Sequence, residues 1–343
     1  MNLIKATGLP VYKPKTGFKY PWAYEIWEQH DAMVWHKSEY DLSQDVIDFS
    51  KADESEKWII TNIMKLFTEN DTVASTGYAV MLRIFKPFEV YGMLSSFNDR
   101  EITHTHNYAN FTETIGLGDD IYSEFLEIPV METKTTYIDK AKVKKFEDYK
   151  AMNLSNAEVD RVYREDIAKM LAVYAGGLEG TALMAQFAML LIFQAQGKYP
   201  GLCTIVEWSV KDEMMHLKGN AQLFRSFIEE NLDIWNDELK YEICEAFREI
   251  VAYEHALIDY LNPKDKDMYK RYVEYMADNA LNELGMKKNW NVVKNPIPFM
   301  EDITGIIQTD FFSGRVTEYS KTVDGSWDEI DYSRWLSHID TQS

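Results

Sequence analysis

The chain has 343 residues, with 36 lysines and arginines against 56 aspartates and glutamates, for a formal net charge of −20. This length is enough for one large hydrophobic core or two medium-sized domains. So acidic a protein is not expected to bind nucleic acid or an anionic membrane surface unaided. We therefore predict no nucleic-acid partner and no membrane partner.

The two cysteines, Cys203 and Cys244, lie far apart and lack a metal-binding spacing, so neither a disulfide framework nor thiol chemistry is predicted. The N-terminal stretch has no apolar core and no cleavage pattern and is not expected to be a signal peptide. The long apolar run at 171–193 is interrupted by polar residues and glycines, which favours a buried core helix over a membrane span. A cytoplasmic protein is expected.

The first third of the chain is predicted to hold two long helices. Residues 1–22, with three prolines, are predicted to form an extended N-terminal arm, and 24–35 carry aromatic side chains at helical spacing. Residues 36–45 have the composition of a loop. The long helices are predicted at 53–85, where an aspartate and a glutamate have capping-box spacing, and at 89–115.

The middle of the chain is less regular. Residues 119–153 are mixed, and their basic run KAKVKK is interpreted as a solvated face. Ser155 and Glu158 again have capping-box spacing. They predict a helix that passes through a Gly-Gly pair, where we expect a kink, and continues to about residue 196.

Further helices are predicted at 202–230, 236–261 and 266–284. After these the periodicity is lost, and from Arg315 the chain has the composition of a flexible tail, with aromatic residues among acids. No segment of consequence has the alternating pattern of a β-strand, so the chain is predicted to be all-α.

The stretch NDREITHTHNYANF, in the second long helix, presents Glu101, His104 and Tyr108 on one face, because positions i, i+3 and i+7 lie together on a helix. A Glu-x-x-His motif on a helix is how helical bundles present metal ligands to their core. An acid, Asp71, precedes Glu101 by 30 residues, one helix earlier. We predict a metal pair here that oxidises Tyr108.

A second copy of this pattern lies in the other half of the chain. Glu179 precedes Glu213, in the motif Glu213-x-x-His216, by 34 residues. Each half is a pair of antiparallel helices, so two pairs should face each other. Burying four acids is costly without cations, which favours a metal site. The alternative interpretation is a plain bundle whose acids form interior ion pairs and helix caps.

The predicted ligands are four carboxylates and two imidazoles: Asp71, Glu101, His104, Glu179, Glu213 and His216. An oxygen-rich site with one histidine per metal suits iron or manganese better than zinc or copper. The remaining histidines have no such setting and are interpreted as structural or surface residues: His30, His36, His106, His255 and His338.

These motifs resemble those of one family, the small, radical-generating subunit of class I ribonucleotide reductase. The similar segments are TENDTVAS, REITHTHNY, GGLEGTALM and SVKDEMMHLKG, and the resemblance runs from about Tyr24 into the C-terminal tail. It implies that the six residues hold a dinuclear metal centre with Glu101 and Glu213 bridging, and that Tyr108 carries a tyrosyl radical. Two irons are the expected metals, with two manganese ions or a manganese–iron pair as alternatives.

The resemblance also implies a route for the radical. Trp35 matches the family's electron-transfer tryptophan, and Asp212 would link Trp35 to His104 by hydrogen bonds. Tyr319 matches the tyrosine that hands the radical to the large subunit, with Tyr332 as the alternative. The implied enzyme is a ribonucleoside-diphosphate reductase, active only with a large subunit that binds the nucleotide and the C-terminal tail. A homodimer is implied as well.

The implied fold is a ferritin-like helical bundle with additional helices and a flexible C-terminal tail. The bundle is predicted at 23–290, between the N-terminal arm and a C-terminal segment and tail at 291–343. Three residues depart from the common pattern around the radical: Leu183 one turn after a predicted ligand, Ser209 one turn before another, and Asn107 beside the tyrosine.

Two rival functions remain open. A ferritin-like diiron oxidase or monooxygenase would act directly on a small organic substrate, and a ferritin-like storage protein would only bind iron. The oxidase more usually has glutamate as its first ligand, where this chain has Asp71, and needs no aromatic tail. Storage proteins are typically half this length and have no use for a Trp35–Asp212 pair.

Overall fold

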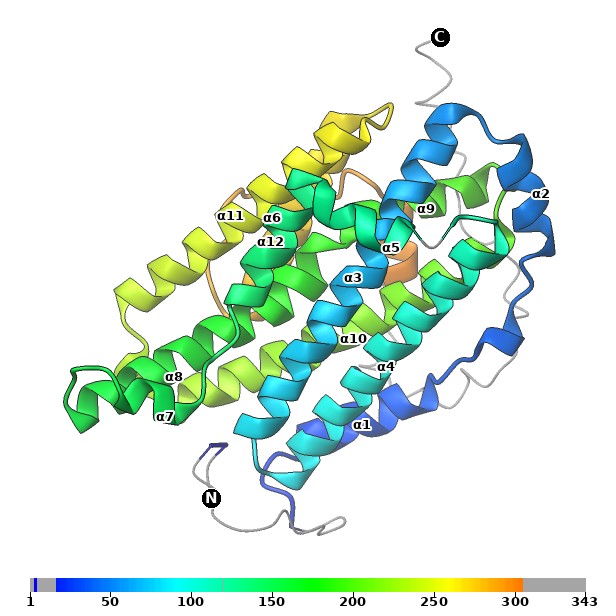
Figure 1. The fold of residues 1–343 in the computed structure, drawn as a ribbon. Helices are drawn as coiled ribbons and strands as arrows, with labels where there is room; N and C mark the ends of the chain where they lie inside the picture. The colour runs from blue at the N-terminus through cyan, green and yellow to red at the C-terminus, as the bar shows by residue number, and fades with distance from the viewer. Residues whose placement is uncertain (1–2, 5–16, 119, 305–343) are drawn as a thin grey trace.

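The protein is described here from a computed structural model, which describes residues 3–4, 17–118 and 120–304 (Figure 1). Within these ranges the chain forms helices and no strand, so the all-α prediction is confirmed. The α-helices are α1 (Pro21–Ala32), α2 (Ser43–Lys51), α3 (Glu54–Ile84), α4 (Phe88–Thr114), α5 (Ile121–Glu124), α6 (Pro129–Lys140), α7 (Phe146–Lys150), α8 (Asn156–Ala172), α9 (Met184–Ala195), α10 (Pro200–Glu229), α11 (Asp237–Leu261) and α12 (Lys266–Glu283).

Four long helical elements form the centre of the bundle (Figure 1). Helix α3 packs along α4, and α10 packs along the run formed by α8, a π-helical segment at Val173–Ala182, and α9. Helix α10 also contacts α4, which brings the two pairs face to face. On the outside, α1 lies against α4 and α10, while α11 and α12 cover the π-helical segment. The ferritin-like bundle with additional helices is therefore confirmed.

Local capping explains where α3 and α8 start and where α11 ends. The Asp53 side chain accepts a hydrogen bond from the Glu56 backbone N–H at 2.8 Å, as the sequence predicts for the start of α3. Ser155 and Glu158 form the predicted capping box of α8. Helix α11 ends at Leu261, and the next residue, Asn262, has a left-handed φ of 54° that turns the chain before α12.

The segment at 36–45 was predicted as a loop, and that prediction is wrong at its C-terminal end, where α2 begins. The helix has only nine residues, and a tertiary contact fixes it. The buried Asp45 carboxylate accepts hydrogen bonds from the backbone N–H groups of Gly201 at 3.0 Å and Leu202 at 2.7 Å. Asp45 thereby satisfies the first turn of α10, a partner that the local sequence does not reveal.

Two other boundaries differ from prediction. The kink expected at the Gly-Gly pair is a π-helical segment of ten residues. The core also extends past residue 290, because Ile297, Phe299, Met300 and Ile303 are buried in it. The long apolar run Asn156–Ala195 passes the length and hydropathy test for a membrane span, but 94% of its most apolar window is buried inside the protein, as predicted for a core helix.

A buried ion pair joins three of these elements away from the predicted metal site. The Lys134 ammonium of α6 lies 2.7 Å from the Glu254 carboxylate of α11 and donates to the Ala182 carbonyl, at the end of the π-helical segment, at 2.8 Å. Gln186 donates to the other Glu254 oxygen at 3.0 Å. Burial lowers the pKa of Lys134 and raises that of Glu254, so each charge depends on its partner.

Replacing Lys134→Met should lower the free energy of unfolding by about 3–5 kcal/mol, because it leaves the Glu254 carboxylate buried without a counter-charge. The double variant Lys134→Met with Glu254→Leu should recover most of this loss. Urea unfolding followed by circular dichroism measures both, with Lys140→Met, exposed on the same helix, as the control. A single variant as stable as this control would show that the pair does not hold the three elements together.

Candidate metal centre

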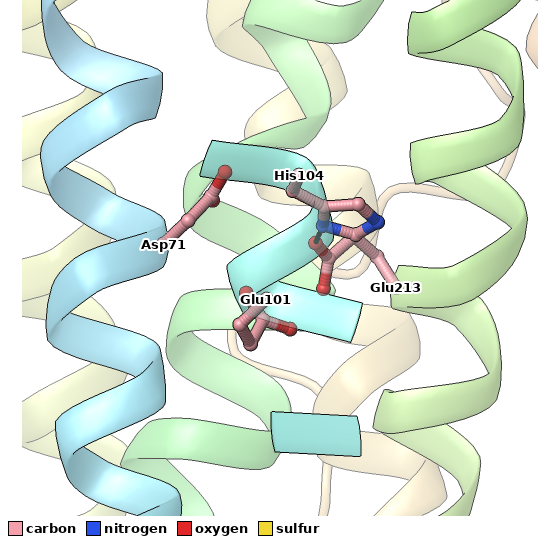
Figure 2. A group of neighbouring side chains, drawn as sticks. All are labelled: Asp71, Glu101, His104 and Glu213. Carbon is pink, nitrogen blue, oxygen red and sulfur yellow. Dashed lines mark ion pairs between the residues drawn. The ribbon is translucent and has the colours of Figure 1, made fainter. Parts of the chain in front are cut away.

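The six predicted ligands converge from four helical elements in the centre of the bundle. Asp71 comes from α3, Glu101 and His104 from α4, Glu179 from the π-helical segment, and Glu213 and His216 from α10. Every one of the six is at most 2% exposed. Figure 2 shows one group of them, with Asp71 facing Glu101, His104 and Glu213 across the space between α3 and α10.

The six side chains form two groups that share two members. In one group, ligand atoms of Asp71, Glu101, His104 and Glu213 all lie within 4.8 Å of one another. In the other, Glu101, Glu179, Glu213 and His216 do the same. Each group thus has one histidine and one carboxylate that the other group does not share, here called its private carboxylate: Asp71 in the first group and Glu179 in the second. Glu101 and Glu213 belong to both groups, which is the arrangement that bridging carboxylates need.

Both imidazoles present the same ring nitrogen to the carboxylates. His104 Nδ1 lies 3.3 Å from a Glu213 oxygen, and His216 Nδ1 lies 2.9 Å from Glu101 and 3.3 Å from the other Glu213 oxygen. The Nε2 atoms point away from the cluster of predicted ligands, that of His104 toward Asp212 and that of His216 toward His30. Each histidine can therefore bind a metal through Nδ1 while Nε2 keeps its proton.

The polar atoms at the centre fit bound metal ions. Outside the cluster, no described residue offers a hydrogen-bond partner to Asp71 Oδ2, Glu101 Oε1, either Glu213 oxygen, or Nδ1 of His104 and His216. Polar atoms inside a protein are rarely left unpaired. Four carboxylates and two imidazoles also match the donor set that iron and manganese accept. Two divalent cations would satisfy these atoms and balance the buried negative charge.

Without cations the charges of the centre are balanced by protons. Burial and the neighbouring Glu101 raise the pKa of Asp71 well above its usual range, and burial raises the pKa of Glu179. Burial alone would lower the pKa of His216, but Glu101 and Glu213 raise it to about 10. His104, beside Asp212 and Glu213, has its pKa raised in the same way. Metal binding at neutral pH should therefore release protons.

The π-helical segment is what aims Glu179 into the centre. It is buried throughout, and glycines let neighbours approach: a Cβ at Gly177 would lie 2.4 Å from Ile250 Cδ1. The Glu179 carboxylate accepts hydrogen bonds from the Tyr78 hydroxyl and, at 3.0 Å, from the Asn220 amide. A π-helical turn widens the helix and is often found at functional sites.

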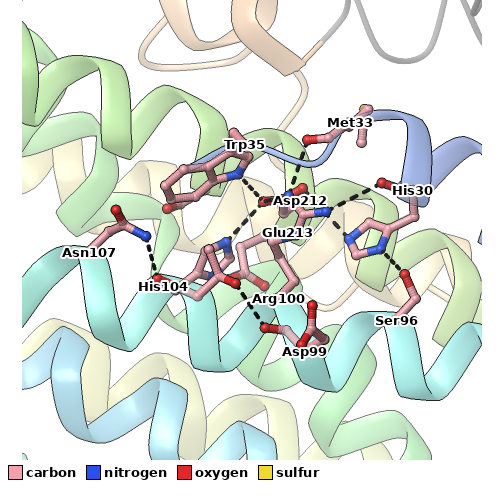
Figure 3. Close-up of polar contacts among 12 residues, drawn as sticks. His30, Met33, Trp35, Ser96, Asp99, Arg100, His104, Asn107, Asp212 and Glu213 are labelled. Carbon is pink, nitrogen blue, oxygen red and sulfur yellow. Dashed lines mark hydrogen bonds and ion pairs between the residues drawn. The ribbon is translucent and has the colours of Figure 1, made fainter. Parts of the chain in front are cut away.

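Figure 3 shows the contacts between Trp35, Asp212 and His104. The Trp35 indole N–H donates to Asp212 Oδ2 at 2.8 Å, and the same oxygen lies 3.0 Å from His104 Nε2. The guanidinium of Arg100 and the His104 imidazole outweigh the effect of burial and hold the pKa of Asp212 well below its usual range. Asp212 is therefore an ionised carboxylate that joins the tryptophan to a predicted ligand.

Tyr108 lies buried beside the first group of ligands. Its hydroxyl donates to Ser209 Oγ at 2.7 Å, and Ser209 in turn donates to the Ile205 carbonyl at 3.0 Å. Its ring centroid lies 5.0 Å from that of Phe67 and 6.4 Å from that of His104. Burial raises the pKa of Tyr108 well above its usual range, so the phenol keeps its proton.

The other departures from the family pattern have different settings. Leu183 is buried at the end of the π-helical segment. Asn107 faces the other way from Tyr108, since its side chain accepts from the Tyr40 hydroxyl at 2.6 Å and donates to the Thr103 carbonyl at 2.7 Å. Tyr319 and Tyr332 lie outside the described residues.

Several residues near the centre were not singled out from the sequence. Asn220 and Tyr78 contact Glu179, and each lies seven residues after a predicted ligand on its own helix, so helical spacing could have indicated them. His30, interpreted only as structural or surface, is fully buried against His216. It carries no spacing signal, because it reaches the centre from α1.

Comparisons with known proteins bear on this site. The family model described as "Ribonucleotide reductase, small chain" matches residues 16–296. A relative from Invertebrate iridescent virus 6, named a probable ribonucleoside-diphosphate reductase small subunit, is 33% identical over 365 residues, covering 96% of this chain and 99% of its own. A ribonucleotide reductase R2 subunit from Clostridium botulinum has a TM-score of 0.77 at 19% identity, covering 89% of this chain and 94% of its own.

Other similar solved structures carry a different name. A tyrosine-to-phenylalanine mutant of an R2-like ligand-binding oxidase, with an aerobically reconstituted Mn/Fe cofactor, has a TM-score of 0.62 at 16% identity, covering 80% of this chain and 100% of its own. At that identity the likeness concerns the fold alone.

The metal-free protein should lose stability as the pH rises from about 6.5 to about 10. His216 has an ordinary pKa of 6.5 and a folded pKa of about 10, so over this window the folded state binds more protons than the unfolded state. Each retained proton lowers the free energy of unfolding by about 1.4 kcal/mol per pH unit. Chemical unfolding at several pH values measures the slope. In the metal-loaded protein the slope should be much smaller, and an equal slope in both forms would contradict this account.

Proposed function

The chain belongs to the family of ribonucleotide reductase small chains, and we propose that it holds a dinuclear metal centre that generates a radical on Tyr108. As the small subunit of a ribonucleoside-diphosphate reductase it acts together with a large subunit. The observation that carries the proposal is the pair of ligand groups that share Glu101 and Glu213, buried within reach of a phenol. A buried acid cluster of this kind has no structural purpose without cations.

The proposed ligands of one metal are Asp71 and His104, those of the other are Glu179 and His216, and both metals share the two bridging glutamates. Iron is the proposed metal, with a manganese pair or a manganese–iron pair as alternatives. When bound, the metal pair supplies the oxidising power that removes an electron from the tyrosine. The chain supplies the donor set, its orientation and a site without solvent exposure.

The surroundings of Tyr108 would protect a radical. The ring packs against Phe67, lies near the His104 imidazole and is 1% exposed, so reductants in solution cannot reach it. Phe187 packs in turn against Phe67, with ring centroids 4.9 Å apart. Ser209 holds the phenolic oxygen in a single hydrogen bond. The pocket thus fixes the ring and excludes water.

The radical is proposed to leave the centre through Trp35. The indole, Asp212 and His104 are joined by hydrogen bonds of 2.8 and 3.0 Å, and the indole also stacks on the His104 ring at 5.9 Å. We propose Tyr319 as the tail residue that passes the radical to the large subunit, with Tyr332 as the alternative. The C-terminal tail would be the docking segment.

Other features of the proposal concern assembly and location. The large subunit would bind the nucleotide, because the cysteines of this chain are distant in sequence and one of them, Cys203, is fully buried. We further propose a homodimer in the cytoplasm. The rival function, a direct oxidase of a small organic substrate, is less well supported, since the relative at 33% identity is a reductase subunit by name.

Metal-free protein supplied with Fe(II) and then oxygen should produce an organic radical visible by electron paramagnetic resonance, with two metals bound per chain. Tyr108→Phe should bind the same amount of metal and give no tyrosyl signal, because only the oxidisable hydroxyl is removed. If iron yields no radical, manganese and a manganese–iron mixture are tested in the same way. A tyrosyl signal that persists in Tyr108→Phe would place the radical on another tyrosine. A protein that binds no metal would contradict the proposed metal centre.

Ending the chain before Arg315 should leave the metal content and the Tyr108 radical unchanged, because the centre lies wholly within the bundle. Nucleotide reduction assayed with the cognate large subunit should fall at least about tenfold, because the shortened chain lacks both the proposed docking segment and the proposed relay tyrosine. Full-length Tyr319→Phe keeps the docking segment but lacks the relay hydroxyl, so it should lose activity while still binding the large subunit. Full activity of the shortened chain would contradict both proposed roles of the tail.

A further inference from the structure

The two proposed metal-binding histidines differ in the residue that contacts their Nε2 atom. His104 Nε2 lies 3.0 Å from the ionised Asp212 carboxylate. His216 Nε2 lies 3.2 Å from another imidazole nitrogen, Nε2 of His30. Otherwise the two positions match, with one histidine, one private carboxylate and two shared glutamates each. His30 therefore belongs to one metal position only.

The neighbours of His30 fix which of its nitrogens carries the proton (Figure 3). Ser96 Oγ donates to Asp31 Oδ1 at 2.7 Å, and its oxygen can then accept from His30 Nδ1, also at 2.7 Å. With the proton on Nδ1, His30 Nε2 offers a lone pair to the His216 Nε2–H. When a metal ion binds, His216 Nδ1 can then give up its proton, as a metal ligand must, while Nε2–H stays bonded to His30.

Packing holds His30 in place. The residue is fully buried at the end of α1, and its ring packs edge-on against Phe97 with centroids 5.0 Å apart. With its Nδ1 held by Ser96, the His30 ring can turn only one nitrogen toward His216.

We propose that His30 is a positioning residue for His216, and that the two metal positions are chemically unequal because an imidazole contacts one ligand histidine and a carboxylate contacts the other. A carboxylate that accepts a hydrogen bond from the second ring nitrogen of a ligand histidine raises the basicity of that ligand more than a neutral acceptor does. The position of Asp71 and His104 is thus the more electron-rich, and the position of Glu179 and His216 depends on His30 for its orientation. This inference rests on the proposed metal ligands.

The test is the binding of Mn(II) alone, without oxygen, to metal-free protein, with free Mn(II) measured by electron paramagnetic resonance. His30→Leu removes the acceptor and should weaken one of the two binding steps by about 10- to 100-fold, the usual effect of losing such a partner. His30→Gln restores an acceptor oxygen and should return that step to within severalfold of the wild-type affinity. His106→Leu, an exposed histidine on α4, is the control and should change neither step.

Single-position variants identify which step is affected. Glu179→Ala removes the private carboxylate of the His216 position, and Asp71→Ala removes that of the His104 position. Adding His30→Leu should have no further effect in the Glu179→Ala background and its full effect in the Asp71→Ala background. A purely structural role for His30 would weaken both positions alike, and the Gln variant would not rescue it.

The outcomes separate the two levels of the proposal. If the wild-type protein binds no Mn(II), the metal centre itself is wrong. If it binds two ions and His30→Leu leaves both affinities unchanged, or lowers them equally, the positioning role is overturned while the centre stands. Selective weakening of one position, rescued by Gln and absent from the Glu179→Ala background, supports the inference.

Discussion

The burial of four carboxylates in one cluster is the constraint on which the rest of the structure depends. Ionised acids cannot share a dry core unless positive charge joins them. In this chain the compensation is local: two imidazoles complete the cluster, and orphaned donor atoms face its centre. The two helix pairs meet where these side chains meet, so the packing of the bundle and the chemistry of the site have a common origin. Metal binding and folding should accordingly be coupled.

The end of α1 and the residues just after it contact both histidines of the proposed metal centre. His30 contacts one of the two proposed ligand histidines directly, and Trp35, five residues later, reaches the other through Asp212. Arg100 ties this segment down, since its guanidinium donates to the Met33 carbonyl at 3.1 Å. One short stretch of chain therefore orients both imidazoles. The same stretch supplies the proposed electron route, which links the positioning of the ligands to the exit of the radical.

Much of this candidate site could be predicted from sequence because its proposed ligands obey helical periodicity. The repeated Glu-x-x-His motif and the preceding acids, Asp71 and Glu179, lie on core faces of long helices, and local spacing determines a face. Helical periodicity also predicted the bounds of α3, α4 and α10 to within two residues. His30 and α2 could not be predicted, because their partners lie on α10, more than 150 residues away. Such contacts exist only once the bundle has formed.

The hydrogen bond between Tyr108 and Ser209 has a consequence for where protons go. A serine hydroxyl can relay a proton but cannot hold an extra one, and Ser209 donates onward to the Ile205 carbonyl, where the chain of hydrogen bonds stops. Among the described residues, this path contains no ionisable group. In the proposed oxidation of Tyr108, it would therefore offer the phenolic proton no base to bind to.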